Sequence, residues 1–157
     1  MEYLFHGKEY TLYNGHEALW QEGPLALALT DKGGCGLTYA SHIQQLNHLG
    51  VFPIAVIPSS VGMWSTLTTV GDGPVKVFEG DIIRRSFGSK ARLGVVKFGR
   101  FRHDDGTEHI GFYVDWVYGR DAEHIRNDLI YWIEHAGAQV IGNTTDNPEL
   151  LEVHIGG

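Results

Sequence analysis

The chain has 157 residues, of which 43% are hydrophobic, and it carries a formal net charge of −7. This length predicts one domain or two small lobes, and the acidic charge argues against a general nucleic-acid binder while leaving room for a local basic patch. The single cysteine, Cys35, excludes an intramolecular disulfide and a zinc site made of cysteines. Because neither a signal peptide nor a run of ~20 apolar residues is present, we expect a cytoplasmic protein with no membrane partner.

The N-terminal part of the chain predicts short strands and one helix. Leu25–Leu29 can form either a strand or a helix, because so short a run does not let periodicity decide. Ser41–Leu49 predicts a helix, since Ser41 can cap its first turn and Gln44 follows as in a capping box. The next segment, residues 51–57, predicts a strand that a proline within it places at a sheet edge.

The strongest interruption of the chain is the Gly-Asp-Gly-Pro sequence at residues 71–74. We place a lobe boundary there, which separates an unassigned N-terminal lobe of residues 1–72 from a β-rich lobe of residues 73–157. In the second lobe, Val75–Phe78 and Asp81–Arg84 predict two strands joined by a tight turn.

A β-hairpin from Leu93 to Trp116, preceded by a polar loop over Ser86–Arg92, is the clearest predicted element. Asp105-Gly106 suits a two-residue type I′ turn, in which both central residues take positive φ. Such a turn pairs Asp104 with Thr107 and thereby decides which side chains share a face. The core-facing side is then expected to carry Val95, Gly99, Phe101, Ile110, Phe112, Val114 and Trp116. The opposite side is expected to carry Arg100, Arg102, His109, Tyr113 and Asp115.

The C-terminal part predicts a helix, a strand and a final helical turn. A helix from Asp121 to about His135 follows from apolar residues at helical spacing, namely Ile125, Leu129, Trp132 and Ile133, although residues 129–133 can also be read as a strand. Ala138–Ile141 predicts the last strand, and Asn147 is expected to cap a turn that opens at Pro148. For the whole chain we expect a mostly β, α+β protein whose curled antiparallel sheet forms a small barrel or sandwich, with two or three short helices.

The charge distribution contains one pronounced asymmetry, which we call the basic run. Seven of the twelve Lys and Arg residues lie within residues 84–102, and no acidic residue interrupts them. Aromatic residues nearby can stack on bases, as in proteins that bind single strands. The candidate interface comprises Arg84, Arg85, Lys90, Arg92, Lys97, Arg100, Arg102 and Tyr113. It can bind nucleic acid, meet an acidic patch on another subunit, or serve as a solvated sheet face that resists edge pairing.

Other chemistry is only weakly indicated. Neither of the histidine pairs six residues apart, His42 with His48 and His103 with His109, has the helical spacing of two metal ligands, and HExxH is absent. His103 opposite Glu108 is better interpreted as a cross-strand polar pair. Four carboxylates can be imagined as a cation or acid–base cluster, but turn chemistry is the better explanation of them: Asp81, Asp104, Asp105 and Glu108. We expect no catalytic residue, no metal site and no cofactor.

Residues 75–152 resemble the YopX-like family of phage and prophage proteins. The likeness rests on four segments, residues 77–84, 94–98, 111–115 and 140–151, of which the last, with its Gly-Asn-x-x-Asp-Asn-Pro-Glu-Leu-Leu phrase, is the most specific. The resemblance implies a β-rich fold, a phage or prophage origin and no assigned activity, so it carries over no functional residues. Residues 1–64 match no family.

Together these observations predict a phage-encoded accessory protein in the bacterial host cytoplasm, which is a non-enzymatic interaction or self-assembling module and a homo-oligomer. The first alternative is a nucleic-acid-binding protein that uses the basic run. The second alternative is a small metal-dependent enzyme.

Overall fold

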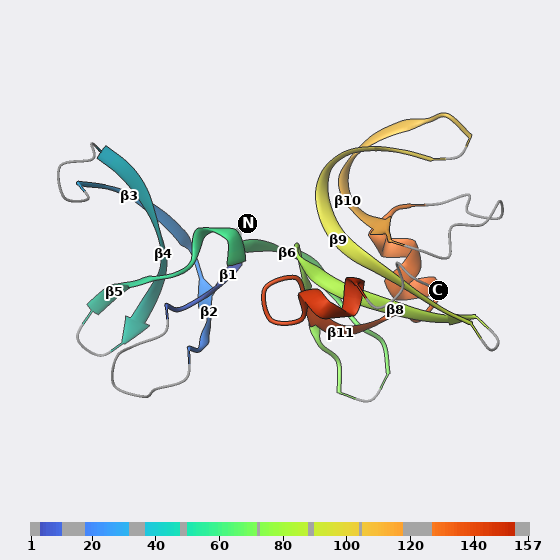
Figure 1. Ribbon diagram of the computed structural model, residues 1–157, viewed down its shortest axis with the longest axis horizontal. Coiled ribbons are helices and arrows are strands. Elements are labelled where there is room, and N and C mark those ends of the chain that lie inside the picture. The colour runs from blue at the N-terminus through green and yellow to red at the C-terminus, as the bar shows by residue number, and fades with distance from the viewer. Residues whose placement is uncertain are drawn as a thin grey trace. The chain divides into compact units, whose positions relative to one another are not determined.

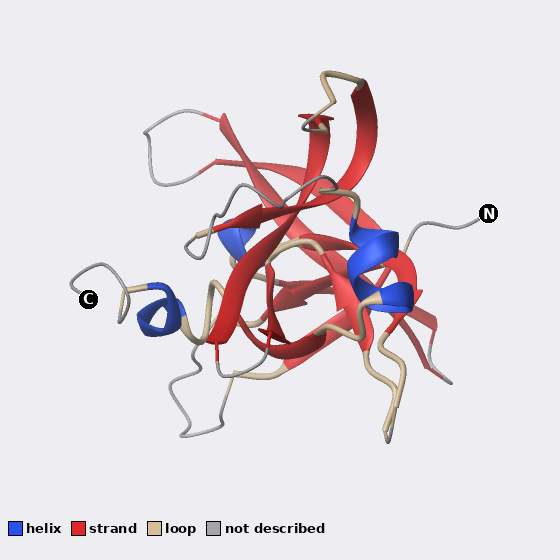
Figure 2. Ribbon diagram, turned by 90° about the vertical axis from the view of Figure 1, so that its right-hand side faces the viewer, coloured by secondary structure: helices blue, strands red, loops and turns tan. Residues whose placement is uncertain are grey.

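The computed structural model describes most of the chain, namely residues 4–10, 18–31, 37–47, 50–71, 73–87, 90–103, 105–117 and 127–152 (Figure 1). The chain divides into two compact units, Met1–Trp64 and Ser65–Gly157. Figure 2 shows that strands dominate, and the seven strand pairs whose register is defined in the described residues are antiparallel, which confirms the mostly β class. The sheets stay open in this described part, so the expected small barrel is not formed. None of the described helices is both long and apolar enough to cross a membrane.

The N-terminal unit contains two small sheets. In one, β1 lies between β2 and the first residues of β6, and in the other the order is β3-β4-β5. The elements are β1 (Phe5–Lys8), β2 (Trp20–Gly23), β3 (Leu25–Asp31), β4 (Leu37–Asn47), β5 (Gly50–Ala55), η1 (Pro58–Ser60) and β6 (Gly62–Thr68). The last of these leads into the C-terminal unit.

The helix predicted for Ser41–Leu49 is wrong. Residues 41–47 belong to β4, which pairs with β3 on one side and with β5 on the other, and residues 48–49 lie outside the described part. A central strand gains ladder hydrogen bonds along both edges, and this non-local gain overrides a weak local capping signal. The ambiguous Leu25–Leu29 is a strand, because it pairs with β4 along one edge, and the proline-containing β5 lies at the other edge of the sheet as predicted.

The C-terminal unit is organised on a four-stranded sheet of order β10-β9-β8-β11. Its elements are β7 (Lys76–Phe78), β8 (Asp81–Phe87), β9 (Lys90–Arg102), β10 (Glu108–Trp116), η2 (Tyr131–His135), β11 (Gln139–Asn143) and η3 (Pro148–Leu151). Figure 1 shows β9 and β10 curling together as one long hairpin. The polar loop expected over Ser86–Arg92 is wrong, because Ser86 pairs with Ala91 and only residues 88–89, outside the described part, remain for a turn.

One face of this sheet packs against η2 to form the core of the unit. The buried cluster comprises Val77, Ile83, Val96, Val114, Leu129, Trp132, Ile133 and Ala138. Each large side chain buried here contributes roughly 1.5–3 kcal/mol before conformational entropy is counted. The burial of Leu129, Trp132 and Ile133 confirms the helical interpretation of their spacing, although the described helical conformation starts at Leu129 and residues 118–126 lie outside the described part.

The pairing of β9 with β10 differs by one residue from the prediction. Phe101 lies opposite His109. The backbone carbonyl oxygen of His103 accepts the Gly106 N–H at 3.0 Å, so the turn has three residues instead of two. Gly106 takes the positive φ of 90° that this turn needs, whereas Asp105 has no positive φ and its carboxylate instead accepts the Thr107 N–H at 2.9 Å. This side-chain hydrogen bond competes with a type I′ turn.

A one-residue shift moves every β9 side chain to the other face of the hairpin. The β9 residues that share the core-facing side with Phe112 and Trp116 are therefore Gly94, Val96, Phe98 and Arg100, and the predicted Val95, Gly99 and Phe101 lie on the opposite side. Phe112 and Trp116 are partly buried against the core, as expected. Ile110, which was also expected there, is 73% exposed.

Candidate functional site

The basic run does not form one continuous face. Arg84 and Lys97 lie on one side of the sheet, whereas Arg85 and Arg92 lie directly opposite each other on the core-facing side. Two more members, Arg100 and Arg102, occupy core-facing positions near the far end of the hairpin, and Lys90 opens β9 opposite Phe87. Tyr113, placed with these residues by sequence, lies opposite Lys97. The alternation of a β-strand thus distributes a run of neighbouring cations over two faces.

Two arginines of the run take part in packing. Arg92 is only 7% exposed. The guanidinium carbon of Arg85 lies 4.9 Å from the centroid of the Trp132 ring, which is a cation–π geometry worth about 0.5–2 kcal/mol. These two side chains therefore extend the core toward the β8–β9 turn, and they add little to a polar surface.

Two other cations of the run are paired with acids across the hairpin. Lys97 Nζ lies 2.6 Å from Asp115 Oδ2, and Arg102 Nη2 lies 2.9 Å from Glu108 Oε1. The hydrogen bond to Asp115 raises the pKa of Lys97. Both pairs are solvent-exposed and contribute at most about 1 kcal/mol of stability each, but they reduce the charge that the surface offers to an anion.

Arg84 and Arg100 are the remaining cations of the run whose side chains are described. Both are exposed, and neither has an acidic partner within the described residues. Arg100 lies directly opposite the exposed Ile110, and Phe98, 47% exposed, lies diagonally from Ile110 on the same face. The ring of Phe98 meets that of Phe112 edge-on at 4.9 Å. We call Phe98, Arg100 and Ile110 the hairpin patch.

Asn127 holds the end of this hairpin against its middle. Its carbonyl oxygen accepts the Val114 N–H at 2.9 Å, and its side-chain amide donates to the Arg102 carbonyl at 2.8 Å. Its backbone N–H donates to Nδ1 of His103 at 3.3 Å. Because Asn127 contacts both the tip and the middle of the ribbon, it fixes the curl that presents the hairpin patch.

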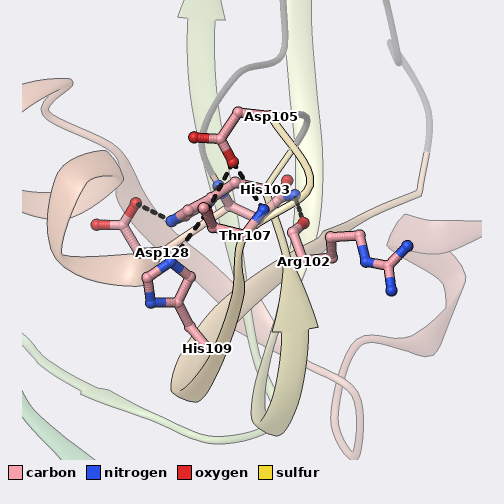
Figure 3. Close-up of polar contacts among 7 residues, drawn as sticks. Arg102, His103, Asp105, Thr107, His109 and Asp128 are labelled. Atoms are coloured by element: carbon pink, nitrogen blue, oxygen red, sulfur yellow. Dashed lines mark hydrogen bonds and ion pairs between the residues drawn. The ribbon is translucent and has the colours of Figure 1, made fainter.

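The tip of the hairpin is a compact polar cluster (Figure 3). His103 Nε2 lies 4.0 Å from Asp128 Oδ1, and His109 Nε2 lies 3.2 Å from Thr107 Oγ1. Hydrogen bonds from the side chain and backbone of Thr107 lower the pKa of Asp105. Since His103 Nδ1 accepts a hydrogen bond, the neutral ring carries its proton on Nε2, facing Asp128. The cluster is therefore a set of bridges that order the tip.

The cross-strand pair predicted between His103 and Glu108 is wrong, because Arg102 occupies the position opposite Glu108 and His103 turns to Asp128. Sequence reasoning also missed Asn127 and Asp128, whose contacts lie far away along the chain and leave no local signal. Within the described residues, no group of three or more His, Cys, Asp or Glu side chains is placed to hold a metal ion.

Asp81 has a structural role at the start of β8. Its Oδ2 accepts the Phe78 N–H at 2.8 Å across the turn that contains Gly80, whose φ is 93°. The carboxyl group is only 5% exposed, and this burial raises its pKa to about 7. Of the four carboxylates considered as a cluster, Asp81 lies at the start of β8, Asp105 and Glu108 make their own contacts beside the hairpin turn, and Asp104 lies outside the described part.

The C-terminal segment 142–151, which was the most specific part of the family resemblance, has a physical basis different from the predicted helix cap. The Asn147 side chain makes no cap hydrogen bond to η3, and its Oδ1 instead accepts the Asn143 N–H at 3.2 Å. Asn143 Oδ1 in turn accepts the N–H groups of Thr145 and Asp146 at 3.0 and 2.8 Å. A Cβ on Gly142 would lie 2.5 Å from Asn147 Oδ1, so only glycine leaves room for this closure. The hydrogen bonds of Asn143 and Asn147 therefore close the loop between β11 and η3.

Comparison with known proteins gives one match. The model of the family described as YopX protein matches residues 72–152, which begin at the glycine-rich interruption, end after η3 and make up just over half of the chain. Neither a curated protein nor a solved structure matches the chain. The matched region contains the curled hairpin, the Asn127 hydrogen bonds that join its tip to its middle, and the Asn143–Asn147 loop. The chain belongs to the YopX protein family.

Proposed function

We propose that the chain is a non-enzymatic accessory protein of phage or prophage origin, which acts in the host cytoplasm by binding a protein partner through the hairpin patch. The partner is a second copy of the chain, so the protein is a homo-oligomer. The observation that carries this proposal is the 73% exposure of Ile110 beside Phe98 and Arg100.

The composition of the hairpin patch supports this use. Single exposed apolar residues are ordinary, but Ile110 and Phe98 occupy diagonal cross-strand positions on one face and form a contiguous surface. Burying either side chain against a partner contributes roughly 1.5–3 kcal/mol. Aromatic residues and arginine are the types enriched at protein interfaces, and Arg100 provides a charged rim.

The hairpin patch is also held in place before any partner arrives. Asn127 joins the tip of the hairpin to its middle through three hydrogen bonds, and the Lys97–Asp115 pair crosses the same two strands. A surface that is already ordered loses less conformational entropy on binding, which favours association.

Nucleic-acid binding by the basic run is the second candidate, and the exposure of Arg84, Lys97, Arg100 and Arg102 is the observation that favours it. Four phosphate contacts to a single strand give a slope of roughly −2.8 in log K against log salt. Two of these cations are already paired with acids, so a strand that contacts only Arg84 and Arg100 gives a slope of roughly −1.4.

The test compares the solution mass of the wild type with that of Ile110→Ser over a range of concentrations, by light scattering and sedimentation. We expect the wild type to associate and Ile110→Ser to remain a monomer. Ile130→Ser is the matched control, because Ile130 is exposed in the same unit but outside the hairpin patch. A monomeric wild type, together with salt-dependent binding to oligonucleotides, contradicts self-assembly and supports the second candidate.

A further inference from the structure

The proposed self-association leaves open which surface receives the hairpin patch, and the charge distribution points to one. Residues 84–102 carry seven cations and no acid, whereas the rest of the chain carries five cations and all 19 acids. Residues 127–152 contain five acidic residues and no Lys or Arg. The matched family region thus contains the basic run, on β8 and β9, and an acidic C-terminal part.

The acidic C-terminal part contains an exposed turn whose charge is opposite to that of the hairpin patch. Glu149 and Glu152, which we call the acidic turn, are exposed in and directly after η3, and neither forms an ion pair with another described residue. Next to them in sequence, Leu150 and Leu151 are only half-buried. Ile141 is exposed at the bulge of β11. It lies two residues before Asn143, whose N–H donates to Asn147 Oδ1. Partly exposed apolar side chains next to carboxylates are complementary in charge to the apolar hairpin patch, which carries Arg100.

The two surfaces cannot meet within one copy. Figures 1 and 2 both place η3 on the side of the C-terminal unit away from the tip of the β9–β10 hairpin. A contact between them therefore needs two copies and uses different surfaces on each, which is a head-to-tail arrangement. The alternative, in which two hairpin patches face each other, brings two Arg100 side chains onto one small contact, where like charges repel.

We infer that the chain assembles head to tail, with the hairpin patch of one copy docked on the acidic turn of a second copy. This inference rests on the proposed self-association and names its partner surface. The pairing is between Arg100 and Glu149 or Glu152, with Ile110 and Phe98 packed on Leu150 and Leu151 beside the acidic turn. Rim charges that pair in this way are screened by salt over a Debye length of about 10 Å at 0.1 M, so association weakens as salt rises.

The test uses charge reversal and mixing. We expect Arg100→Glu alone and Glu149→Arg alone each to raise the dissociation constant of self-association by about tenfold or more. An equimolar mixture of the two variants should associate again, because each hairpin patch then meets an acidic or reversed turn of opposite charge. Glu134→Arg is the matched control, since Glu134 is exposed in the same unit but outside the acidic turn. All variants change exposed side chains, so thermal melts should confirm that folding is retained.

The outcomes separate this inference from the function on which it rests. If Ile110→Ser removes association but Glu149→Arg does not, the protein self-associates through another surface and the head-to-tail arrangement is wrong. If both charge variants weaken association and their mixture stays monomeric, Arg100 and Glu149 do not pair and the arrangement is equally wrong. A wild type that stays monomeric at every concentration overturns both the arrangement and the proposed self-assembly.

Discussion

Asp81 should set how the stability of the C-terminal unit depends on pH. Its carboxyl group is almost fully buried at the start of β8 and accepts one hydrogen bond, from the Phe78 N–H at 2.8 Å. Burial raises its pKa from the ordinary 3.8 to about 7, and the hydrogen bond offsets only part of this effect. The folded state therefore holds a proton at Asp81 over a pH range in which the unfolded chain has released it.

The sign of the effect follows from this difference in proton binding. Because the folded-state pKa is raised, the contribution of Asp81 to the free energy of unfolding is fully present below about pH 4 and is lost as the pH rises through about 7. A difference of about three pKa units corresponds to roughly 4 kcal/mol. About 4 kcal/mol is a large fraction of the 5–15 kcal/mol free energy of unfolding of a typical domain.

Asp81→Asn removes the titration while keeping an oxygen that can accept the Phe78 N–H. Urea unfolding of both proteins at several pH values between 4 and 8 should show that the wild type loses about 4 kcal/mol relative to the variant as the pH rises. Glu134→Gln is the control, because Glu134 is an exposed carboxylate in the same unit and lies outside the proposed interface. A constant difference between wild type and Asp81→Asn across this range would refute the argument, since it would mean that Asp81 does not titrate there.

Three further predictions concern the packing and the backbone. Phe112→Ala should lower the free energy of unfolding by about 2–3 kcal/mol, less than for a fully buried ring, and a cost below about 0.5 kcal/mol in urea titrations would contradict its place beside the core. Gly142→Ala should cost about 1–3 kcal/mol, because its new methyl group meets Asn147, and adding Asn147→Ala should make the costs less than additive. Thr66 has a φ of 69°, so Thr66→Gly should raise the unfolding free energy by about 1 kcal/mol, whereas a lowered urea midpoint would show that the strain is unimportant.

The sequence by itself determined the elements whose signals are local and repeated. Alternating apolar residues predicted the strands of the long hairpin, and the helical spacing of Leu129, Trp132 and Ile133 predicted the segment that covers the core. The four family segments predicted membership of the YopX family over the region where it is found. Each of these patterns extends over several residues, so no single competing contact could override it.

How these elements combine depends on contacts that the sequence pattern does not contain. Alternation assigns side chains to faces within one strand, but the pairing between two strands depends on the turn, where Asp105 bonds to Thr107 and shifts the register by one residue. The same alternation splits the basic run over two faces, and the curl that Asn127 fixes leaves Ile110 exposed. Residues 41–47 form a strand and no helix, because β4 pairs with a neighbour on each edge. Apart from the local Asp105–Thr107 bond, hydrogen bonds between distant segments made these choices, and no local sequence pattern encodes them.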